Sequence, residues 1–321
     1  MSHHKILKLT VIFILLLGSL FFVSNESLAA TSRWVAVGAG TNTIAYSNDG
    51  INWIGNGKSI FSTNGFSVAW NGSRWVAVGN GTNTIAYSSD GVNWTPVVNS
   101  TSTFATAGRD IVWNGSRWVA VGNGTNTIAY SSDGVNWTPV STSIFTIGAG
   151  IAWNGSRWVA VGAGTNTIAY SDNGIDWTPA TNSTSIFSTT GNKVAWNGSR
   201  WVAVGVGTNT IAYSDNGIDW TPATNSTSIF STNGRDVAWN GSHWVAVGAG
   251  TNTIAYSNDG ITWASVVNST STFSIAGFGI AWNGAYFVAV GQSNNTIAYS
   301  SDGIDWISAT NSTSIFSTNG A

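Results

Sequence analysis

The chain has 321 residues, a formal net charge of −2 and no cysteine, and charged residues make up 7% of it. Soluble domains usually carry about a quarter charged residues, so Ser, Thr, Asn and Gly must cover most of this surface. The charge balance argues against a nucleic-acid partner, because phosphate contacts need a basic stripe, and the lack of cysteine excludes disulfides.

The first thirty residues are expected to be a signal peptide. Lys5 and Lys8 precede an apolar run at Leu9–Val23, and small residues at Ser27–Ala29 have the spacing of a signal peptidase site. We expect cleavage after Ala29 or Ala30, which predicts a secreted or cell-envelope protein with no membrane span in the mature chain. Retention of the apolar run as an anchor is the alternative, although the run is short for a membrane span.

Residues 31–321 are predicted to form a single domain built from one repeated unit. A Trp-Val-Ala-Val-Gly string, with Phe replacing Trp in its last copy, recurs every 40–43 residues, starting at Trp34, Trp75, Trp118, Trp158, Trp201, Trp244 and Phe287. This period, combined with strand-type patterning, is typical of a β-propeller blade.

The unit Val68–Asp110 illustrates the strands that we expect in each repeat. Short apolar or alternating runs are separated by glycine-containing turns at Asn71-Gly72 and Asp90-Gly91. The four predicted strands are Val68–Trp70, Arg74–Gly79, Thr84–Ser88 and Val92–Val97. The two sides of Arg74–Gly79 are both apolar or small, as expected for a strand packed between two neighbouring sheets. No helical period follows the leader.

The predicted fold class is therefore all-β: a seven-bladed β-propeller of about 40–43-residue, four-stranded blades. A β-solenoid is the alternative, but its coils are usually shorter. The Trp-Val-Ala-Val-Gly string occurs seven times, but the strand expected before it, which ends in tryptophan, occurs six times, the last copy ending at Trp282. One blade would therefore lack its innermost strand or be closed by the chain ends. A fragment of a longer array is another interpretation, and an open blade edge would invite self-association.

A serine, an aspartate, a glycine and a tryptophan surround the second turn of each repeat, as in Ser88–Trp94. This pattern resembles the Asp-box, or bacterial neuraminidase repeat, of sialidase-like propellers, although the turn here is one residue tighter. The aspartates at these turns are Asp49, Asp90, Asp133, Asp172, Asp215, Asp259 and Asp302. At Asp172 and Asp215 the aspartate moves back one place and asparagine takes the turn. We interpret the seven as structural, with a calcium or glycan ligand at each turn as the alternative.

The resemblance to sialidases implies glycoside chemistry, which the residues do not support. Sialidases use an arginine trio, a tyrosine activated by glutamate, and an aspartic acid, whereas the one glutamate here is Glu26 in the leader. Hydrolysis of a glycoside needs two carboxylates in different environments. His243 is the one histidine after the leader, which leaves a metal site or a serine–histidine pair without support. We therefore predict no enzyme activity, no cofactor and no metal.

The repeats differ most just before the first strand, at a position expected to border the central channel. The varied residues there predict a binding surface at the channel rim, with drift at a tolerant loop end as the alternative. The candidate binding residues are Phe66, Arg109, Asp110, Asn192, Lys193, Arg235, Asp236 and Phe278.

Two functions fit a non-catalytic propeller with a variable channel rim. The first is a secreted, non-catalytic module that binds a glycan or cell-surface polymer through several equivalent sites and gains by avidity. The second is a protein-interaction or assembly scaffold, similar to photosystem II assembly-factor-like propellers, that docks one protein partner at the variable rim.

Overall fold

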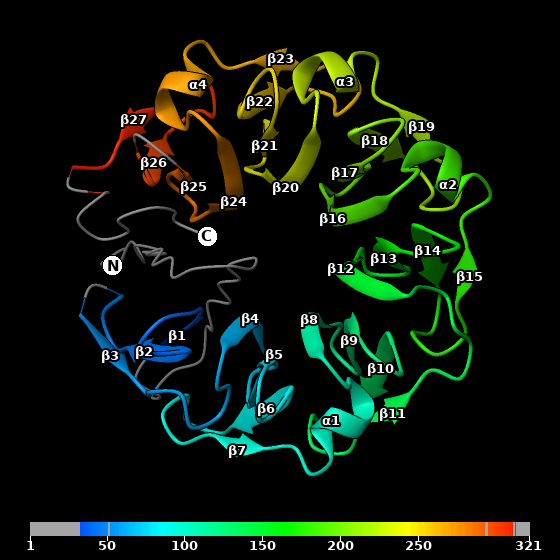
Figure 1. The fold of residues 1–321 in the computed structure, drawn as a ribbon, viewed down its shortest axis with the longest axis vertical. Coiled ribbons are helices and arrows are strands. Elements are labelled where there is room, and N and C mark those ends of the chain that lie inside the picture. The colour runs from blue at the N-terminus through cyan, green and yellow to red at the C-terminus, as the bar shows by residue number, and fades with distance from the viewer. Residues whose placement is uncertain (1–32, 51, 293–294, 311, 313–321) are drawn as a thin grey trace, which may run out of the picture.

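The computed structural model describes residues 33–50, 52–292, 295–310 and 312. The predicted signal peptide lies outside these residues. The described chain is nearly all β and forms curled antiparallel sheets around a centre, so the predicted propeller class is confirmed (Figure 1). No helix in this part of the chain is long and apolar enough to cross a membrane.

Each blade is an antiparallel meander whose strands run outward from the centre in chain order. The first strands are β4 (Asn64–Trp70), β8 (Ala107–Trp113), β12 (Ile147–Trp153), β16 (Thr190–Trp196), β20 (Asn233–Trp239) and β24 (Ala276–Trp282). The second strands are β1 (Trp34–Val37), β5 (Trp75–Asn80), β9 (Trp118–Asn123), β13 (Trp158–Ala163), β17 (Trp201–Val206), β21 (Trp244–Ala249) and β25 (Phe287–Gln292).

The third strands are β2 (Ile44–Ser47), β6 (Ile85–Ser88), β10 (Ile128–Ser131), β14 (Ile168–Ser171), β18 (Ile211–Ser214), β22 (Ile254–Ser257) and β26 (Ile297–Ser300). The outermost strands are β3 (Trp53–Gly55), β7 (Thr95–Pro96), β11 (Thr138–Pro139), β15 (Thr178–Pro179), β19 (Thr221–Pro222), β23 (Ala264–Ser265) and β27 (Ile307–Ser308). Within the described residues, β1–β3 has no first strand of its own. The number of blades in the whole ring stays a prediction, because residues 1–32 and 313–321 fall outside the description.

Three local predictions were wrong. The first strand is longer than expected, since β4 begins at Asn64 and not at Val68, whereas the outermost strand shrinks to Thr95–Pro96. One-turn helices interrupt several crossovers: α1 (Ser100–Thr103), α2 (Ser183–Ile186), α3 (Ser226–Ile229) and α4 (Ser269–Thr272). A single turn leaves too few residues for a 3.6-residue hydrophobic period to be visible in the sequence.

The hairpin turns also differ from expectation. Asn71 N–H donates to the Arg74 carbonyl at 3.1 Å, so Gly72 and Ser73 are the two central residues and Asn71 closes the turn. At the second turn positive φ occurs at Gly91 (71°) but not at Asp90, which excludes the predicted type I′ geometry.

The repeated string explains how the blades adhere. Val76 and Val78 on one side of β5 pack in one buried cluster with Trp118 on the other side of β9. The same valine-to-tryptophan packing recurs between later blades, with Phe287 in place of tryptophan in the last one. The string is therefore complementary to its own next copy, which confirms that the second strands pack between neighbouring sheets.

The Trp-Val-Ala-Val-Gly string ends in glycine because no side chain fits at that position. A Cβ on Gly122 would lie 2.8 Å from the ring of Phe104 and would also meet the backbone oxygen of Ala107. Phe104 is fully buried at the end of α1, where it fills the space between crossover and sheet.

Candidate functional site

The centre of the ring is shaped by a one-residue bulge in each first strand. In β4 the pairing with β5 shifts between Gly65 and Ser67, which leaves Phe66 as the extra residue. Such a bulge re-aims the side chains around it. We call the extra residues the rim positions: Phe66, Arg109, Ala149, Asn192, Arg235 and Phe278. The next residues are the channel positions: Ser67, Asp110, Gly150, Lys193, Asp236 and Gly279.

Two arginines at rim positions each lie against a phenylalanine of an adjacent blade. The Arg109 guanidinium carbon is 5.3 Å from the centre of the Phe66 ring, and that of Arg235 is 4.4 Å from the Phe278 ring. Burial lowers the pKa of both arginines, although a guanidinium stays charged in proteins. The stacked rings hold the two cations in place at an apolar rim.

The rim also contains unused hydrogen-bond capacity. Arg109 Nε is buried and has no hydrogen-bond partner among the described residues. Arg235 Nε donates to Asn233 Oδ1 at 3.2 Å, and Asn192 Nδ2 donates to the Gly234 carbonyl at 2.7 Å. A buried donor without a partner is costly, so Arg109 is suited to meet an oxygen of a ligand.

Asp110 is buried completely and its carboxylate is saturated with donors. Oδ1 accepts from Ser67 Oγ at 3.0 Å and from Ile111 N–H at 2.9 Å. Oδ2 accepts from Ile151 N–H at 3.0 Å and from Lys193 Nζ at 2.8 Å. These four bonds join strands of four blades, and the ion pair links residues 83 positions apart in sequence.

Asp236 occupies the same repeat position but has fewer donors. Its two oxygens accept from Val237 N–H at 2.8 Å and from Ile280 N–H at 2.9 Å, and these are its hydrogen bonds in the described structure. Desolvation by burial raises the pKa of Asp236 to about 6, although the charge of Lys193 and the two backbone N–H groups oppose that rise.

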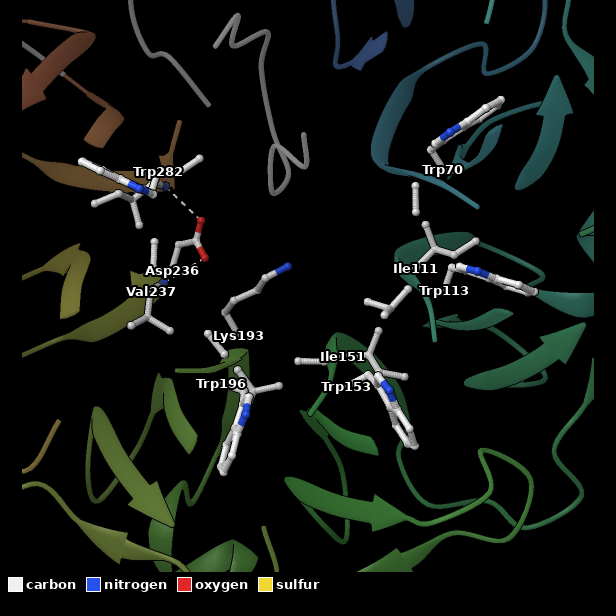
Figure 2. A pocket seen from close by; sticks show the side chains of 18 residues that line it. Trp70, Ile111, Trp113, Ile151, Trp153, Lys193, Trp196, Asp236, Val237 and Trp282 are labelled. Carbon is white, nitrogen blue, oxygen red and sulfur yellow. Dashed lines mark hydrogen bonds between the residues drawn. The ribbon is translucent and has the colours of Figure 1, made fainter. Parts of the chain in front are cut away.

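A cavity of about 500 Å³ extends from these charged side chains along the ends of the first strands. Its wall includes Lys193 and Asp236, the alanine and valine side chains that follow them, and tryptophans such as Trp113 and Trp196. Figure 2 shows Lys193 and Asp236 on adjacent strands, facing the same central space, with the tryptophans around it.

The eight predicted binding residues thus fall into two sets. Phe66, Arg109, Asn192, Arg235 and Phe278 are half-buried at rim positions. Asp110, Lys193 and Asp236 are 0%, 6% and 5% exposed, so they belong to the channel wall and not to a rim surface. Adjacent residues of a strand project to opposite sides, which separates the two sets.

The predicted Asp-turn aspartates also fall into two sets. Asp133 accepts hydrogen bonds from Ser131 Oγ at 2.9 Å and from the N–H groups of Val135 and Asn136 at 2.8 Å each. Matching contacts occur at Asp90, Asp259 and Asp302, and Asp49 accepts from Ser47 and Asn52. Partial burial would raise the pKa of Asp133, but the backbone donors outweigh it and hold that pKa well below its usual range.

Asp172 and Asp215 lie one place before the turn, and the asparagine that follows each makes the turn contacts, as the sequence indicated. Asn173 accepts the turn bonds from Ser171 Oγ and Ile175 N–H, and Asn216 does the same in the next blade. The displaced aspartates point outward and pair with Arg157 and Arg200, each at 2.7 Å.

Sequence reasoning missed a link between blades on the perimeter. Arg157 stacks on Tyr170 of its own blade and donates through Nη1 to the Asn216 carbonyl in the turn of the next blade. We call this contact the arginine clasp. It is also made by Arg33, Arg74, Arg117 and Arg200. In the last two copies the arginine position holds His243 and Tyr286. The recurrence of arginine, tyrosine and an Asp-Gly or Asn-Gly turn at fixed spacing was the available signal.

No group of three or more histidines or acidic residues among the described residues could hold a metal ion. The predicted lack of a metal or cofactor stays a prediction.

No protein-family model matches the chain, and no curated protein does. Among solved structures it is similar to YCF48 bound to a D1 peptide, with 18% identity, a TM-score of 0.61, and coverage of 93% of this chain and 98% of that chain. YCF48 from Cyanidioschyzon merolae gives 15% identity, a TM-score of 0.53, and coverage of 76% and 84%. The WD40 propeller domain of Doa1 gives 11% identity, a TM-score of 0.54, and coverage of 93% and 98%. At these identities the similarity establishes the propeller fold.

Proposed function

We propose that this protein is a non-catalytic propeller scaffold that holds an acidic segment of a protein partner at the rim. The observation that carries the proposal is the pair of half-buried arginines, Arg109 and Arg235, each stacked on a phenylalanine, with the buried Nε–H of Arg109 finding no partner among the described residues. Arginine and aromatic side chains dominate the energetics of protein interfaces.

The choice of an acidic segment follows from charge. Asp110 and Asp236 follow the two arginines in sequence, but their carboxylates are buried in the channel wall and accept other donors. The guanidinium groups therefore keep their capacity to pair with carboxylates, and such bonds are strong when both partners are charged. That a propeller of similar fold has been solved with a bound peptide supports a protein partner over a glycan.

The test uses fluorescein-labelled hexaglutamate, with hexaglutamine and hexalysine as matched peptides, in fluorescence anisotropy titrations. We expect hexaglutamate to bind at one site per chain and the other two to bind at least tenfold more weakly. Combining Arg109→Ala with Arg235→Ala should abolish binding. The control combines Arg74→Ala with Arg200→Ala, which removes the same charge from the perimeter and should retain binding. Equal loss in both variants would contradict a role for the rim.

Binding of a glycan or cell-surface polymer is the second candidate function, and a separate experiment tests it. Several equivalent sites per chain in a titration against a glycan array would favour a multivalent lectin over a scaffold with one partner. Secretion after cleavage near Ala29 or Ala30 is proposed as well, and the mass of the mature protein tests it.

A further inference from the structure

Asp110 and Asp236 occupy one repeat position but differ in what surrounds them, and the difference identifies a second site. A carboxylate offers about four acceptor positions. Asp110 uses four, on Ser67, Ile111, Ile151 and Lys193. From the described residues Asp236 accepts two backbone N–H groups, so each of its oxygens keeps acceptor capacity.

Among the described residues, the cation that acts on Asp236 is Lys193, which is hydrogen-bonded to Asp110. Lys193 on β16, the blade before, reaches past Gly150 and pairs with Asp110 at 2.8 Å. The two strands approach closely there, since a Cβ on Gly150 would lie 3.1 Å from Cα of Lys193. The charged groups that act on Asp236 are Lys193 and Asp110, one of each sign, and β24 on its other side contributes the Ile280 N–H. With Asp236 ionised, the three buried groups carry a net charge of −1.

There is also space beside Asp236. At Gly279, the channel position of the next blade, a Cβ would meet Asp236 Oδ2 at 3.7 Å and Val290 at 3.4 Å, which are ordinary contacts. The cavity of about 500 Å³ begins at this carboxylate and is otherwise lined mainly by apolar side chains, and its size is in the range of small-molecule sites. Figure 2 shows the Asp236 carboxylate at the edge of that central space.

We propose that the channel cavity is a binding site for an organic ammonium ion with an apolar body, whose cationic head pairs with Asp236 while its alkyl part lies among the alanines and tryptophans. The site is separate from the rim. The rim positions precede the channel positions in each strand, whereas the cavity follows them toward the tryptophan ends. The two sites also prefer opposite charges.

An anionic ligand is the main rival, because Lys193 also lines the cavity. The geometry disfavours it, since the Lys193 ammonium is already held by Asp110. Removing that ammonium from Asp110 would leave a buried carboxylate uncompensated, which is costly.

The experiment is isothermal titration calorimetry of the full chain with n-hexylamine, 1-hexanol and hexanoate at pH 7.5. We expect one hexylamine per chain, with hexanol and hexanoate binding at least tenfold more weakly. Hexanoate binding as tightly as hexylamine would overturn the proposal, and so would equal affinities for hexylamine and hexanol. This comparison needs no variant, so it holds even if a substitution prevents folding.

Three further readouts locate the ammonium. Asp236→Asn should weaken hexylamine binding at least tenfold, whereas Asp305→Asn, at an exposed aspartate of an outer turn, should leave it unchanged. Gly279→Ala should weaken binding by occupying the space beside Oδ2. Lowering the pH from 7.5 to 5 should weaken binding about tenfold, because the pKa of Asp236 is about 6. Full affinity in Asp236→Asn would place the ligand elsewhere and refute the site.

Discussion

The perimeter and the channel of this propeller are built from the same repeats but follow opposite rules. On the perimeter, the turn around Asp133 has the same contacts as the turn around Asp90, and each clasp arginine repeats the one before it. At the channel positions, Ser67, Asp110 and Lys193 differ in size and charge. The residues that join each blade to the next on the perimeter are therefore repeated, whereas the residues at the channel, where all the blades converge, vary.

Electrostatics accounts for the difference. Each perimeter turn satisfies its own hydrogen bonds in contact with water, so the repeated turns do not interfere with one another. The channel positions converge in a buried space, where like charges repel strongly because the local dielectric is low. A strict repeat of Asp110 would place several buried carboxylates close together, and their mutual repulsion would destabilise the ring.

Breaking the channel ion pair should have the largest effect on stability. Lys193→Ala leaves the buried Asp110 carboxylate without its cation, which should lower the free energy of unfolding by about 3–5 kcal/mol. The matched control is Lys58→Ala at an exposed lysine, with an expected change within about 0.5 kcal/mol. Urea denaturation measures both, and similar losses would contradict the role of the pair.

The second effect is a pH dependence that comes from Asp236. Burial raises its pKa from 3.8 to about 6, so the folded state binds the proton more tightly than the unfolded chain. The resulting stability is complete below the unfolded pKa and is lost as the pH rises through 6, with a total of about 2–3 kcal/mol. Unfolding curves between pH 4 and 7 should show this decline in the natural chain and a flatter profile in Asp236→Asn. An unchanged slope would mean that another group titrates.

The third effect separates the two kinds of perimeter aspartate. Asp133→Ala removes hydrogen bonds from a serine, an asparagine side chain and two backbone N–H groups, and should cost about 1–2 kcal/mol. Asp172→Ala removes a salt bridge on the surface and should cost about 0.2–1 kcal/mol. Thermal denaturation of the two variants tests this order. A larger cost for Asp172→Ala would contradict the assignment of these turn contacts to Asn173.

The smallest effect on stability should come from restoring the arginine clasp where histidine replaces the arginine. His243→Arg places a guanidinium where earlier copies clasp the next turn, near Tyr256 and the Asp302 carbonyl by analogy with Arg200, Tyr213 and Asp259. A stabilisation of about 0.5 kcal/mol is expected from one stacked, hydrogen-bonded cation at an exposed site. The reverse change, Arg200→His, should lower stability by a similar amount. Melting temperatures that move in the same direction for both variants would rule out the clasp.

The sequence predicted the propeller class and the blade order because the determinants are local. A strand of alternating small and large apolar residues, followed by glycine and a turn and repeated every 40–43 residues, predicts the blade of a propeller. The strand at Trp75–Asn80 forms as expected. Local signals were less reliable at the ends of elements. Asn71-Gly72 looked like the centre of a turn, yet Asn71 closes it through its side-chain oxygen.

The sequence by itself determined where the repeat fails to repeat, and so selected Arg109, Asp110, Lys193 and Asp236. What those residues do was decided by tertiary structure. Arg109 is the extra residue of a one-residue bulge and Asp110 is the residue after it, and ring geometry brings Asp110 within 2.8 Å of Lys193, two blades further along. Pairing over such a separation depends on the path of the backbone around the ring, and no local pattern encodes that path.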